Sequence, residues 1–322
     1  MTRPIAVYTD VVGTDPQPGI ELLEAAGFEV RVASSADPAM IAQTAQDAQA
    51  LLIGYSPVDA ELLDRLGELR IVATQSVGFD MVDTEAAAHR GIWVSNVPAA
   101  ATEEVATHAF AMALSLMRGL PFLDRDVRAG NWNVSNEKPR RLSETTVGVV
   151  GLGRIGARFA SLIRPAVGTV LGFDPFLDVP DGVESVALPE LFARSELISL
   201  HLPLSAGTAG LVNAATLALM PRGSFLVNVS RGGLVDHGAL AHALDSGQLG
   251  GAALDVLAVE PPDAADAMVG HPRVLLSPHA AYLSAESARD YVLQQAENVV
   301  SWHHRQIPKN PVNTPLVAQF TA

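Results

Sequence analysis

The sequence of 322 residues contains no cysteine. This absence excludes disulfide bonds, thiolate nucleophiles and zinc sites made of thiolates, although it does not by itself indicate a compartment. Basic residues are also scarce, since 21 Lys and Arg stand against 35 Asp and Glu and give a formal net charge of −14. A nucleic-acid-binding protein must neutralise phosphates, so this charge and the lack of any basic run argue against a nucleic-acid partner.

Long hydrophobic runs are absent as well. No apolar stretch approaches the ~20 residues of a membrane span, and the N-terminus enters a strand-like segment at Ile5 almost at once. We therefore expect a cytoplasmic protein without a membrane partner. Hydrophobic residues still make up 48% of the chain, and its length predicts about two domains.

A glycine-rich turn organises the second half of the chain. Gly151, Gly153 and Gly156 fit the G-x-G-x-x-G pattern of dinucleotide-binding folds and follow the strand-like run Val147–Val150. One glycine makes the tight turn, one lets the backbone approach a pyrophosphate, and one lets the helix contact the strand. Free N–H groups at the start of that helix would stabilise the anion. A glycine-rich turn between two ordinary elements would show the same residues, so the pattern alone leaves that alternative open.

The surroundings of the turn favour the nucleotide site. A second strand, Thr169–Phe173, ends on Asp174, which lies 18 residues past Gly156. That is close to the spacing of roughly 20 residues expected for the carboxylate that accepts hydrogen bonds from the adenosine ribose. A carboxylate there would repel a 2′-phosphate, and Pro175 and Phe176 supply no compensating Arg. The sequence therefore predicts NAD rather than NADP.

Strand-like and helix-like segments alternate on both sides of the turn, which predicts an α/β protein with parallel sheets. The first 96 residues carry no phosphate-binding glycine pattern of their own and are expected to form the second wall of a cleft. Thr102, followed by two Glu, is the predicted cap of a long helix that extends to about Gly119. Arg125 to Trp132 is predicted to be a surface loop or a subunit contact. The expected strands are Ile5–Tyr8, Phe28–Ala33, Leu51–Gly54, Ile71–Ala73, Ile92–Val94, Val147–Val150, Thr169–Phe173, Leu197–Leu200, Phe225–Val229, Ala252–Val256 and Val274–Leu276.

Three strand ends carry candidate catalytic residues, namely Arg231, Glu260 and His279. Ligands of doubly wound sheets bind outside the carboxyl ends of the strands, where these residues would converge. Arg presents a planar fork to a carboxylate, and a His beside a carboxylate can give a proton to a carbonyl oxygen. Next to a nicotinamide these groups would reduce a 2-oxo acid. Spacing alone leaves open that Arg231 and Glu260 are surface residues, and His201, which also follows a strand, fits backbone support of the cofactor better than catalysis.

The motifs together resemble the D-isomer-specific 2-hydroxyacid dehydrogenases over nearly the whole chain. The matching segments are Ser76-Val-Gly-Phe-Asp80, Asn96-Val-Pro98, Gly151-Leu-Gly-Arg-Ile-Gly156, Asp174-Pro175, His201-Leu-Pro203, Val227-Asn-Val-Ser-Arg-Gly-Gly-Leu-Val-Asp236, Ala253-Leu-Asp255-Val, Glu260-Pro261 and Ser277-Pro-His279. The resemblance implies that Arg231 orients the substrate, that His279 donates and accepts the proton, and that Glu260 is the partner of His279.

The resemblance also implies the domain organisation and the remaining site. It predicts a homodimer with two Rossmann-like domains: a doubly wound NAD-binding domain of residues 98–289, and a discontinuous, flavodoxin-like substrate domain of residues 1–97 and 290–322. It predicts no metal site. The predicted cofactor-binding residues are Gly151, Gly153, Arg154, Ile155, Gly156, Asp174, His201, Pro203, Val229, Ser230, Asp255 and Thr102, and the predicted substrate-binding residues are Ser76, Val77, Gly78, Arg231 and Tyr282.

The substrate is predicted from charge. Residues 73–79, Ala73 to Phe79, contain no cation, which favours an unphosphorylated acid such as glyoxylate, hydroxypyruvate or pyruvate, with Phe79 and Tyr282 as possible walls of the pocket. Arg3, Arg70 or a partner subunit could still supply a cation, so phosphoglycerate dehydrogenase stays open as an alternative. A second alternative is an NAD-sensing binding module, because His279-Ala-Ala-Tyr282 also resembles the C-terminal-binding corepressors. Glu260 argues against formate dehydrogenases, which are similar in outline but have an amide in place of that carboxylate.

Overall fold

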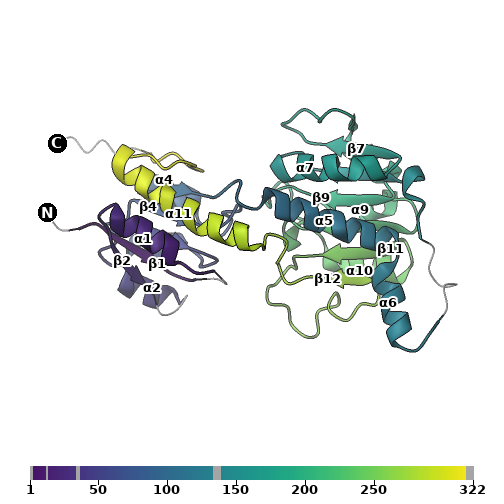
Figure 1. Cartoon of the computed structure of the whole chain (residues 1–322), viewed down its shortest axis with the longest axis horizontal. Helices are drawn as coiled ribbons and strands as arrows, with labels where there is room; N and C mark the ends of the chain where they lie inside the picture. Colours follow the sequence, from purple (N-terminus) through teal and green to yellow (C-terminus); the bar gives the residue numbers. More distant parts are fainter. Residues whose placement is uncertain (1–2, 12–13, 34–36, 133–138, 317–322) are drawn as a thin grey trace. The chain divides into compact units, whose positions relative to one another are not determined.

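The protein is described by a computed structural model that covers residues 3–11, 14–33, 37–132 and 139–316. It divides into two compact units, Met1–Ala100 with Ser284–Ala322 (unit 1) and Ala101–Leu283 (unit 2) (Figure 1). The predicted division lies after residues 97 and 289, and it includes residues 1–2 and 317–322, which lie outside the described residues. Each unit is built on one parallel sheet, which confirms the predicted α/β class with two such domains.

Unit 1 contains a five-stranded sheet with the order β2-β1-β3-β4-β5, the order of flavodoxin-like folds. Its central strands are apolar and buried on both faces, as expected for a parallel sheet covered by helices on both sides. The strands are β1 Ile5–Tyr8, β2 Glu29–Val32, β3 Ala50–Ile53, β4 Ile71–Thr74 and β5 Trp93–Ser95, and the helices are α1 Gln17–Ala25, α2 Pro38–Thr44, α3 Ala60–Asp64, α4 Thr84–His89 and α11 Ala285–Arg305.

Helix α11 belongs to unit 1 although it follows unit 2 in the chain. Ser284 begins it with a capping box, and Ala296, Val299 and Trp302 pack into the core beneath β1, β3 and β4. Gln295 donates its amide N–H groups to the carbonyls of Ile53 and Ala73 at 3.0 and 2.8 Å. The helix therefore covers one face of the sheet and satisfies backbone groups near the ends of two strands.

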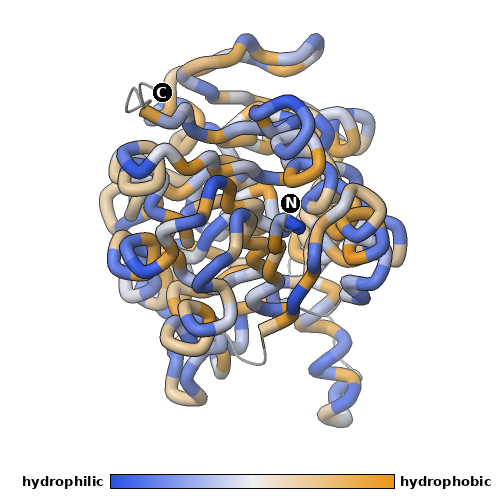
Figure 2. Tube along the Cα trace, turned by 90° about the vertical axis from the view of Figure 1, so that its left-hand side faces the viewer, coloured by the Kyte–Doolittle hydropathy of each residue, from blue (hydrophilic) through white to orange (hydrophobic). Residues whose placement is uncertain are grey.

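Unit 2 contains a seven-stranded parallel sheet with the order β12-β11-β10-β9-β6-β7-β8. Counted from β6, this is the Rossmann order, with one further strand at the edge. Hydrophilic and hydrophobic residues intermix along the chain trace in Figure 2, as expected where one side of each element faces a core. The strands are β6 Thr146–Val150, β7 Thr169–Phe173, β8 Glu184–Ser185, β9 Leu197–Leu200, β10 Ser224–Asn228, β11 Leu249–Leu254 and β12 Val274–Leu276. The helices are α5 Thr102–Met117, α6 Leu120–Arg128, α7 Arg154–Ile163, α8 Leu188–Arg194, α9 Ala214–Leu219 and α10 His237–Asp245, and the 3₁₀ turns are η1 Leu142–Glu144, η2 Arg164–Ala166 and η3 Gly232–Leu234.

Two local predictions were wrong. Thr102 is the first helical residue of α5, and the N-cap is Ala101, whose side chain makes no capping hydrogen bond. Ala101 is fully buried, so a small apolar residue fits there, while Glu103 and Glu104 still complement the positive end of the helix. The loop predicted for Arg125 to Trp132 is partly helical, because α6 extends to Arg128 with Pro121 in its first turn, while the alternative of a subunit contact stays a prediction.

No helix within the described ranges is both long and apolar enough to cross a bilayer.

Candidate active site

The glycine-rich turn after β6 has the shape that a dinucleotide phosphate requires. Gly151 has a φ of 89°, and a Cβ built on it would lie 2.4 Å from the carbonyl oxygen of His201. A Cβ on Gly156 would lie 1.9 Å from the oxygen of Gly151, so both positions exclude a side chain. A Cβ on Gly153 would meet no atom within 4 Å. The turn is therefore closed toward the protein and open at Gly153, the N-cap of α7, where helical N–H groups attract anions.

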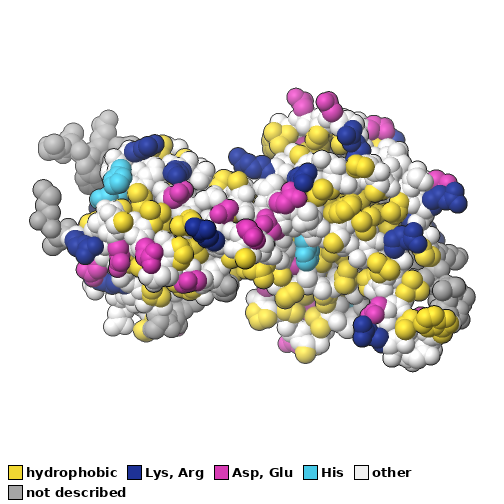
Figure 3. Space-filling view, viewed as in Figure 1, with side chains coloured by type: hydrophobic (Ala, Val, Ile, Leu, Met, Phe, Trp, Pro, Cys, Tyr) yellow, Lys and Arg dark blue, Asp and Glu magenta, His cyan; other side chains and the backbone are white. Residues whose placement is uncertain are grey.

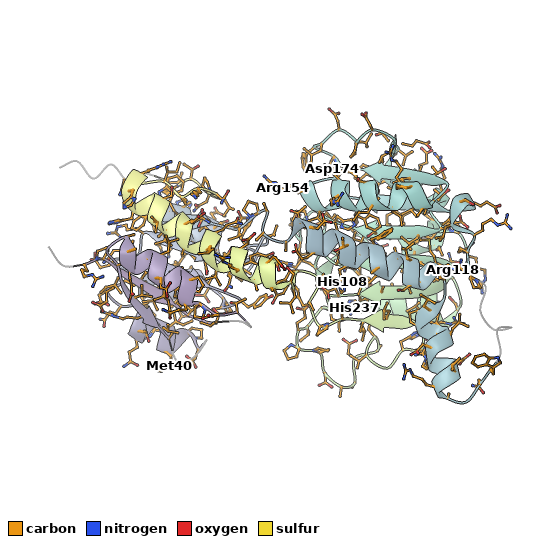
Figure 4. All side chains as sticks on the ribbon, in the orientation of Figure 1. Met40, His108, Arg118, Arg154, Asp174 and His237 are labelled. Carbon is orange, nitrogen blue, oxygen red and sulfur yellow. The ribbon has the colours of Figure 1, made fainter. Side chains whose placement is uncertain are left out.

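Asp174, the first residue after β7, lies beside this turn and shapes it. Its Oδ2 accepts a 2.8 Å hydrogen bond from Leu152 N–H inside the turn. Its Oδ1 accepts hydrogen bonds from the N–H groups of Phe176 and Leu177. Figure 4 labels Asp174 together with Arg154, the exposed first residue of α7. The carboxylate thus fixes two backbone segments next to the predicted ribose position, a role that the sequence spacing did not predict.

His201 follows β9, and its backbone carbonyl packs against the glycine-rich turn at Gly151. Its ring packs against Phe159 at a centroid distance of 4.9 Å, and its Nε2 lies 2.8 Å from Ser199 Oγ. Its Nδ1 is buried with no hydrogen-bond partner among the described residues. Burial lowers the pKa of His201 to about 3, so its imidazole is neutral near pH 7 and is a poor proton donor. This agrees with the predicted supporting role. Pro203 is exposed two residues further on, and its carbonyl accepts a 2.7 Å hydrogen bond from Thr208 Oγ1.

Arg231 follows β10 in a turn that the preceding residues stabilise. Asn228 donates to the carbonyl of Arg231 at 2.9 Å and accepts from Ser230 N–H, while Ser230 Oγ donates to Leu200 O on the neighbouring strand. A Cβ on Gly232 would lie 2.1 Å from the carbonyl of Leu257, so only glycine lets the two strand ends approach this closely. Val229, at the same strand end, is buried. The turn brings the Arg231 backbone next to the loop that carries Glu260.

Glu260 and His279 form a direct pair. His279 Nδ1 lies 2.6 Å from Glu260 Oε2, and Glu260 Oε1 accepts a hydrogen bond from Leu257 N–H. Burial raises the pKa of Glu260, but the hydrogen bonds from His279 and Leu257 and the charges of His279 and Arg231 outweigh it, so the net pKa lies below the ordinary value. Glu260 is therefore an ionised acceptor that fixes the ring of His279. The ring of Tyr282 meets the His279 ring edge-on at 6.5 Å.

Asp255, the first residue after β11, holds the loop of His279. Its side chain is only 1% exposed and accepts hydrogen bonds from Ser277 Oγ and from the N–H groups of Ala280 and Ala281. Its carbonyl accepts the N–H of His279 at 2.7 Å. These bonds stabilise His279 in a left-handed conformation with a φ of 51°, which costs a non-glycine residue about 1 kcal/mol or more. Asp255 thus positions His279, and direct contact of Asp255 with the cofactor stays a prediction.

Ser76, Val77 and Gly78 lie in unit 1, in the loop after β4. The carbonyls of this loop are occupied: Ser76 O accepts from Val97 N–H, Val77 O from Asn96 Nδ2, and Gly78 O from Ser76 Oγ. Within the described part of the chain, no acceptor is recorded for the N–H groups of these three residues. The loop therefore presents donors, as a carboxylate-binding loop requires.

Sequence reasoning missed His108 on α5. Its Nε2 lies 3.0 Å from Ser277 Oγ, next to Asp255. The two partners are separated by 169 residues, so no local pattern connects them. Among the described residues there is no cluster of side chains suited to hold a metal ion.

The fold and the site define a nicotinamide-nucleotide-dependent dehydrogenase. A family model, "D-isomer specific 2-hydroxyacid dehydrogenase, NAD binding domain", matches residues 110–281. The chain belongs to the D-isomer-specific 2-hydroxyacid dehydrogenase family, and is an NAD(P)-dependent oxidoreductase of that class. The glycine-rich turn fits such a cofactor, because the space beside Gly153 is open and a side chain at this position would occupy it.

Relatives and solved structures agree with this family. The chain is 37% identical over 287 residues to a glyoxylate reductase of Korarchaeum cryptofilum, which covers 86% of each protein. Among solved structures, D-lactate dehydrogenase from Aquifex aeolicus, complexed with NAD and lactic acid, is 29% identical with a TM-score of 0.86 and covers 96% of this chain and 99% of that one. The NADPH-dependent glyoxylate/hydroxypyruvate reductase of Sinorhizobium meliloti, in complex with NADP and malonate, is 29% identical with a TM-score of 0.86 over 97% of both chains. The chain spans about half the length of the D-3-phosphoglycerate dehydrogenases that it matches, such as 52% of that of Bacillus subtilis at 36% identity.

Proposed function

We propose that the protein interconverts a small, unphosphorylated 2-oxo acid and its D-2-hydroxy acid with NAD(H). The observation that supports this most is the 2.6 Å contact between His279 and Glu260 at the sheet edge that also carries Arg231 and the glycine-rich turn. When bound, the nicotinamide supplies or takes up the hydride. The cofactor would be held by the turn from Gly151 to Gly156 with Arg154 and Ile155, by Asp174, and by the strand ends at His201–Pro203 and Val229–Ser230. Thr102, at the start of α5, completes the proposed set.

The protein groups supply binding and the proton. The Arg231 guanidinium pairs with the substrate carboxylate and orients the carbonyl. Glu260, ionised because of its lowered pKa, accepts a hydrogen bond from His279 Nδ1–H, and Nε2–H of the imidazolium donates its proton to the carbonyl oxygen during reduction, which leaves a neutral imidazole. In the oxidative direction the same Nε2 accepts the hydroxyl proton. Tyr282 is proposed to border the substrate beside His279.

We propose NAD(H) rather than NADP(H) as the cofactor. Asp174 places a negative charge beside the glycine-rich turn, and a 2′-phosphate there would be repelled. No Arg or Lys lies among the residues that directly follow Asp174. One relative was solved with NAD and another, from Sinorhizobium meliloti, with NADP, so membership of the family does not decide the cofactor. The proposed preference therefore depends on Asp174.

An unphosphorylated substrate is supported by the positions of two cations that the sequence left open. Arg3 donates to the carbonyls of Gly27 and Phe28, and Arg70 donates to those of Gly67 and Leu69. Both precede their strands and lie at the amino edge of the sheet of unit 1, whereas residues 75–79 lie at its carboxyl edge. Neither Arg therefore serves the loop at Ser76.

We propose a homodimer because the segment of α6 and the residues after it expose several apolar side chains. Leu120, Val127 and Trp132 are 56, 49 and 91% exposed on and after α6, and hydrophobic atoms are visible at this end of unit 2 in Figure 3. Such side chains favour burial against a second copy. Sedimentation of Trp132→Ser against the parental chain tests this contact. The cytoplasmic location stays a prediction.

The proposed activity is tested by NADH consumption over glyoxylate, hydroxypyruvate, pyruvate, phenylpyruvate, 2-oxoglutarate and phosphohydroxypyruvate. We expect the highest kcat/KM with one of the first three. A clear preference for phosphohydroxypyruvate would favour phosphoglycerate dehydrogenase instead. Tight NADH binding without turnover of any acid would favour the NAD-sensing binding module.

A further inference from the structure

A chain of three polar side chains connects α5 to the loop of His279. His108 Nε2 lies 3.0 Å from Ser277 Oγ, and Ser277 Oγ lies 2.5 Å from Asp255 Oδ1. His108 Nε2 itself is 3.8 Å from the same carboxylate oxygen. Figure 4 labels His108 on α5, which packs against β10 and β11. All three residues belong to unit 2.

The donors along this chain have one consistent direction. Ser277 has a single hydroxyl hydrogen and donates it to Asp255 Oδ1, an oxygen that also accepts the N–H of Ala280. Ser277 Oγ must then accept from His108, so His108 carries its proton on Nε2. The order is His108 Nε2–H to Ser277 Oγ–H to Asp255 Oδ1. A hydroxyl that accepts one hydrogen bond donates the next one more strongly.

The chain ends on the carboxylate that holds the loop of the proton donor. Asp255 accepts the N–H groups of Ala280 and Ala281 at 2.9 and 3.0 Å, and its carbonyl accepts that of His279 at 2.7 Å. His279 has a left-handed φ of 51°, a conformation that a residue with a side chain retains only when its neighbours enforce it. A change in the direction of the Asp255 carboxylate therefore changes the position of the His279 ring relative to Glu260.

We propose that His108 is a positioning residue for His279 and acts through Ser277 and Asp255. Among the described residues, His108 makes polar contacts with Ser277 and Asp255 and forms no hydrogen bond or ion pair with Glu260 or His279. Its side chain is 31% exposed, so it is not a buried core residue whose loss must collapse the fold. Its role is to supply the hydrogen bond that fixes the Ser277 hydroxyl toward Asp255, and through it the backbone from His279 to Ala281.

The test measures the loop directly and then the reaction. Amide hydrogen exchange at residues 279–281 is compared in the parental chain and in His108→Ala, with His242→Ala, an exposed His on α10, as the matched control. We expect roughly tenfold faster exchange at Ala280 and Ala281 in His108→Ala and parental exchange in His242→Ala. His108→Gln, which retains an N–H donor of similar reach, should restore most of the protection.

The kinetic readout separates positioning from general damage. His108→Ala should lower kcat roughly tenfold while the KM for the 2-oxo acid and the Kd for NADH stay near parental values, because no group proposed to hold the acid or the cofactor is replaced. Ser277→Ala should show the same loss, and the double variant should show no further loss, since both act through one chain. Additive losses in the double variant would show that the two residues act separately and would overturn the proposal.

The inference rests on the proposed function for its kinetic part only. If the parental protein turned over no 2-oxo acid, the proposed function would fail, while the exchange measurement would still decide whether His108 holds the loop. Unchanged protection of Ala280 and Ala281 in a folded His108→Ala variant would overturn the positioning role, whatever the activity of the parental chain.

Discussion

The two units differ in the residues that follow their first strand: glycine in unit 2 and a carboxylate in unit 1. In unit 2, β6 ends at Val150 and is followed by Gly151, and the turn is open at Gly153. In unit 1, β1 is followed by Thr9 and Asp10, and Asp10 accepts hydrogen bonds from Gly54 N–H, Tyr55 N–H and Ser56 Oγ at the end of β3. Burial raises the pKa of Asp10, but the hydrogen bonds from Thr9, Tyr55, Gly54 and Ser56 outweigh it, so the net pKa is lowered.

This difference explains how one kind of sheet serves two purposes. In both units the first strand lies where the strand order reverses, which is where ligands of open α/β sheets bind. Unit 2 leaves backbone N–H groups at that point for an external anion. Unit 1 instead carries the Asp10 carboxylate there, which binds the N–H groups of Gly54 and Tyr55 after β3 and would repel a phosphate. The turn residues, and not the strand order, thus assign the dinucleotide to unit 2.

The largest expected effect concerns the chemistry on the edge of unit 2. Replacing His279 by Ala removes the positioned proton donor and should lower kcat by roughly 10²–10⁴-fold. The Kd for NADH, measured by fluorescence titration, should change little. His89→Ala, on α4 of unit 1 with a side chain 60% exposed, is the matched control and should keep parental turnover. A near-parental kcat in His279→Ala would contradict the assignment of the proton donor to His279 in unit 2.

A pair of glycine variants sharpens the description of the turn. Gly153 has a φ of −62°, which any residue adopts, so Gly153→Ala should lose only the small stability that Ala costs at an N-cap and should raise the Kd for NADH roughly tenfold, or ~1.4 kcal/mol. Gly151→Ala places a Cβ against His201 O at a φ of 89° and should lower the free energy of unfolding by about 1–3 kcal/mol. Denaturant unfolding and NADH titration of both variants provide the measurement. Equal behaviour of the two would contradict a turn that is closed on one side and open on the other.

Removing the charge beside the turn should change the choice of cofactor. Asp174→Asn keeps one acceptor oxygen, which can serve either Leu152 N–H or the N–H groups of Phe176 and Leu177, and it no longer repels a 2′-phosphate. We expect the ratio of kcat/KM for NADPH to that for NADH to rise by roughly tenfold. Asp178→Asn, at an exposed position four residues further on, controls for the loss of a surface carboxylate. A ratio unchanged in Asp174→Asn would show that another group sets the preference.

The smallest expected effect tests the closed strand end of unit 1. Asp10→Asn should lower the free energy of unfolding near pH 7 by about 1 kcal/mol, because the single amide oxygen cannot accept from both Tyr55 on one side and Gly54 and Ser56 on the other. The folded-state pKa of Asp10 is lowered, so its stabilisation is present above the ordinary value of 3.8 and is lost as the pH falls through the folded value. The parental and variant chains should therefore converge in strong acid. Fluorescence of Trp93 and Trp302, both in unit 1, follows the unfolding; a gap that persisted in acid would assign the loss to packing.

The placement of the candidate site residues was predictable where it depends on strand ends. Because the strands are parallel, the residues that follow them share one edge, and the sequence therefore placed Arg231, Glu260 and His279 in one region. The pairing of Glu260 with His279 is observed at 2.6 Å. The glycine pattern was informative for the same reason, since each glycine corresponds to one close backbone approach.

The remainder depends on contacts that no short pattern encodes. His108 is connected to Ser277 across 169 residues, and Asp174 accepts N–H groups from Leu152 and from its own loop. Strand β8 has two exposed residues, Glu184 and Ser185, and thus lacks the hydrophobic signature of a strand. The tertiary positions of Arg3 and Arg70 likewise became clear only from the folded chain.

The return of α11 to unit 1 has a consequence for synthesis on the ribosome. Residues 101–283 form a continuous unit, so unit 2 has all of its residues before α11 is made. The strands of unit 1 are made first, but one face of their sheet includes Ala6, Tyr8 and Leu52, whose packing partners Ala296, Val299 and Trp302 come from α11. Helix α1 also packs on this face and is made early, but the part that α11 covers stays exposed during translation of the entire nucleotide-binding unit, about 10–40 s at 5–20 residues per second. The unit that begins first is completed last.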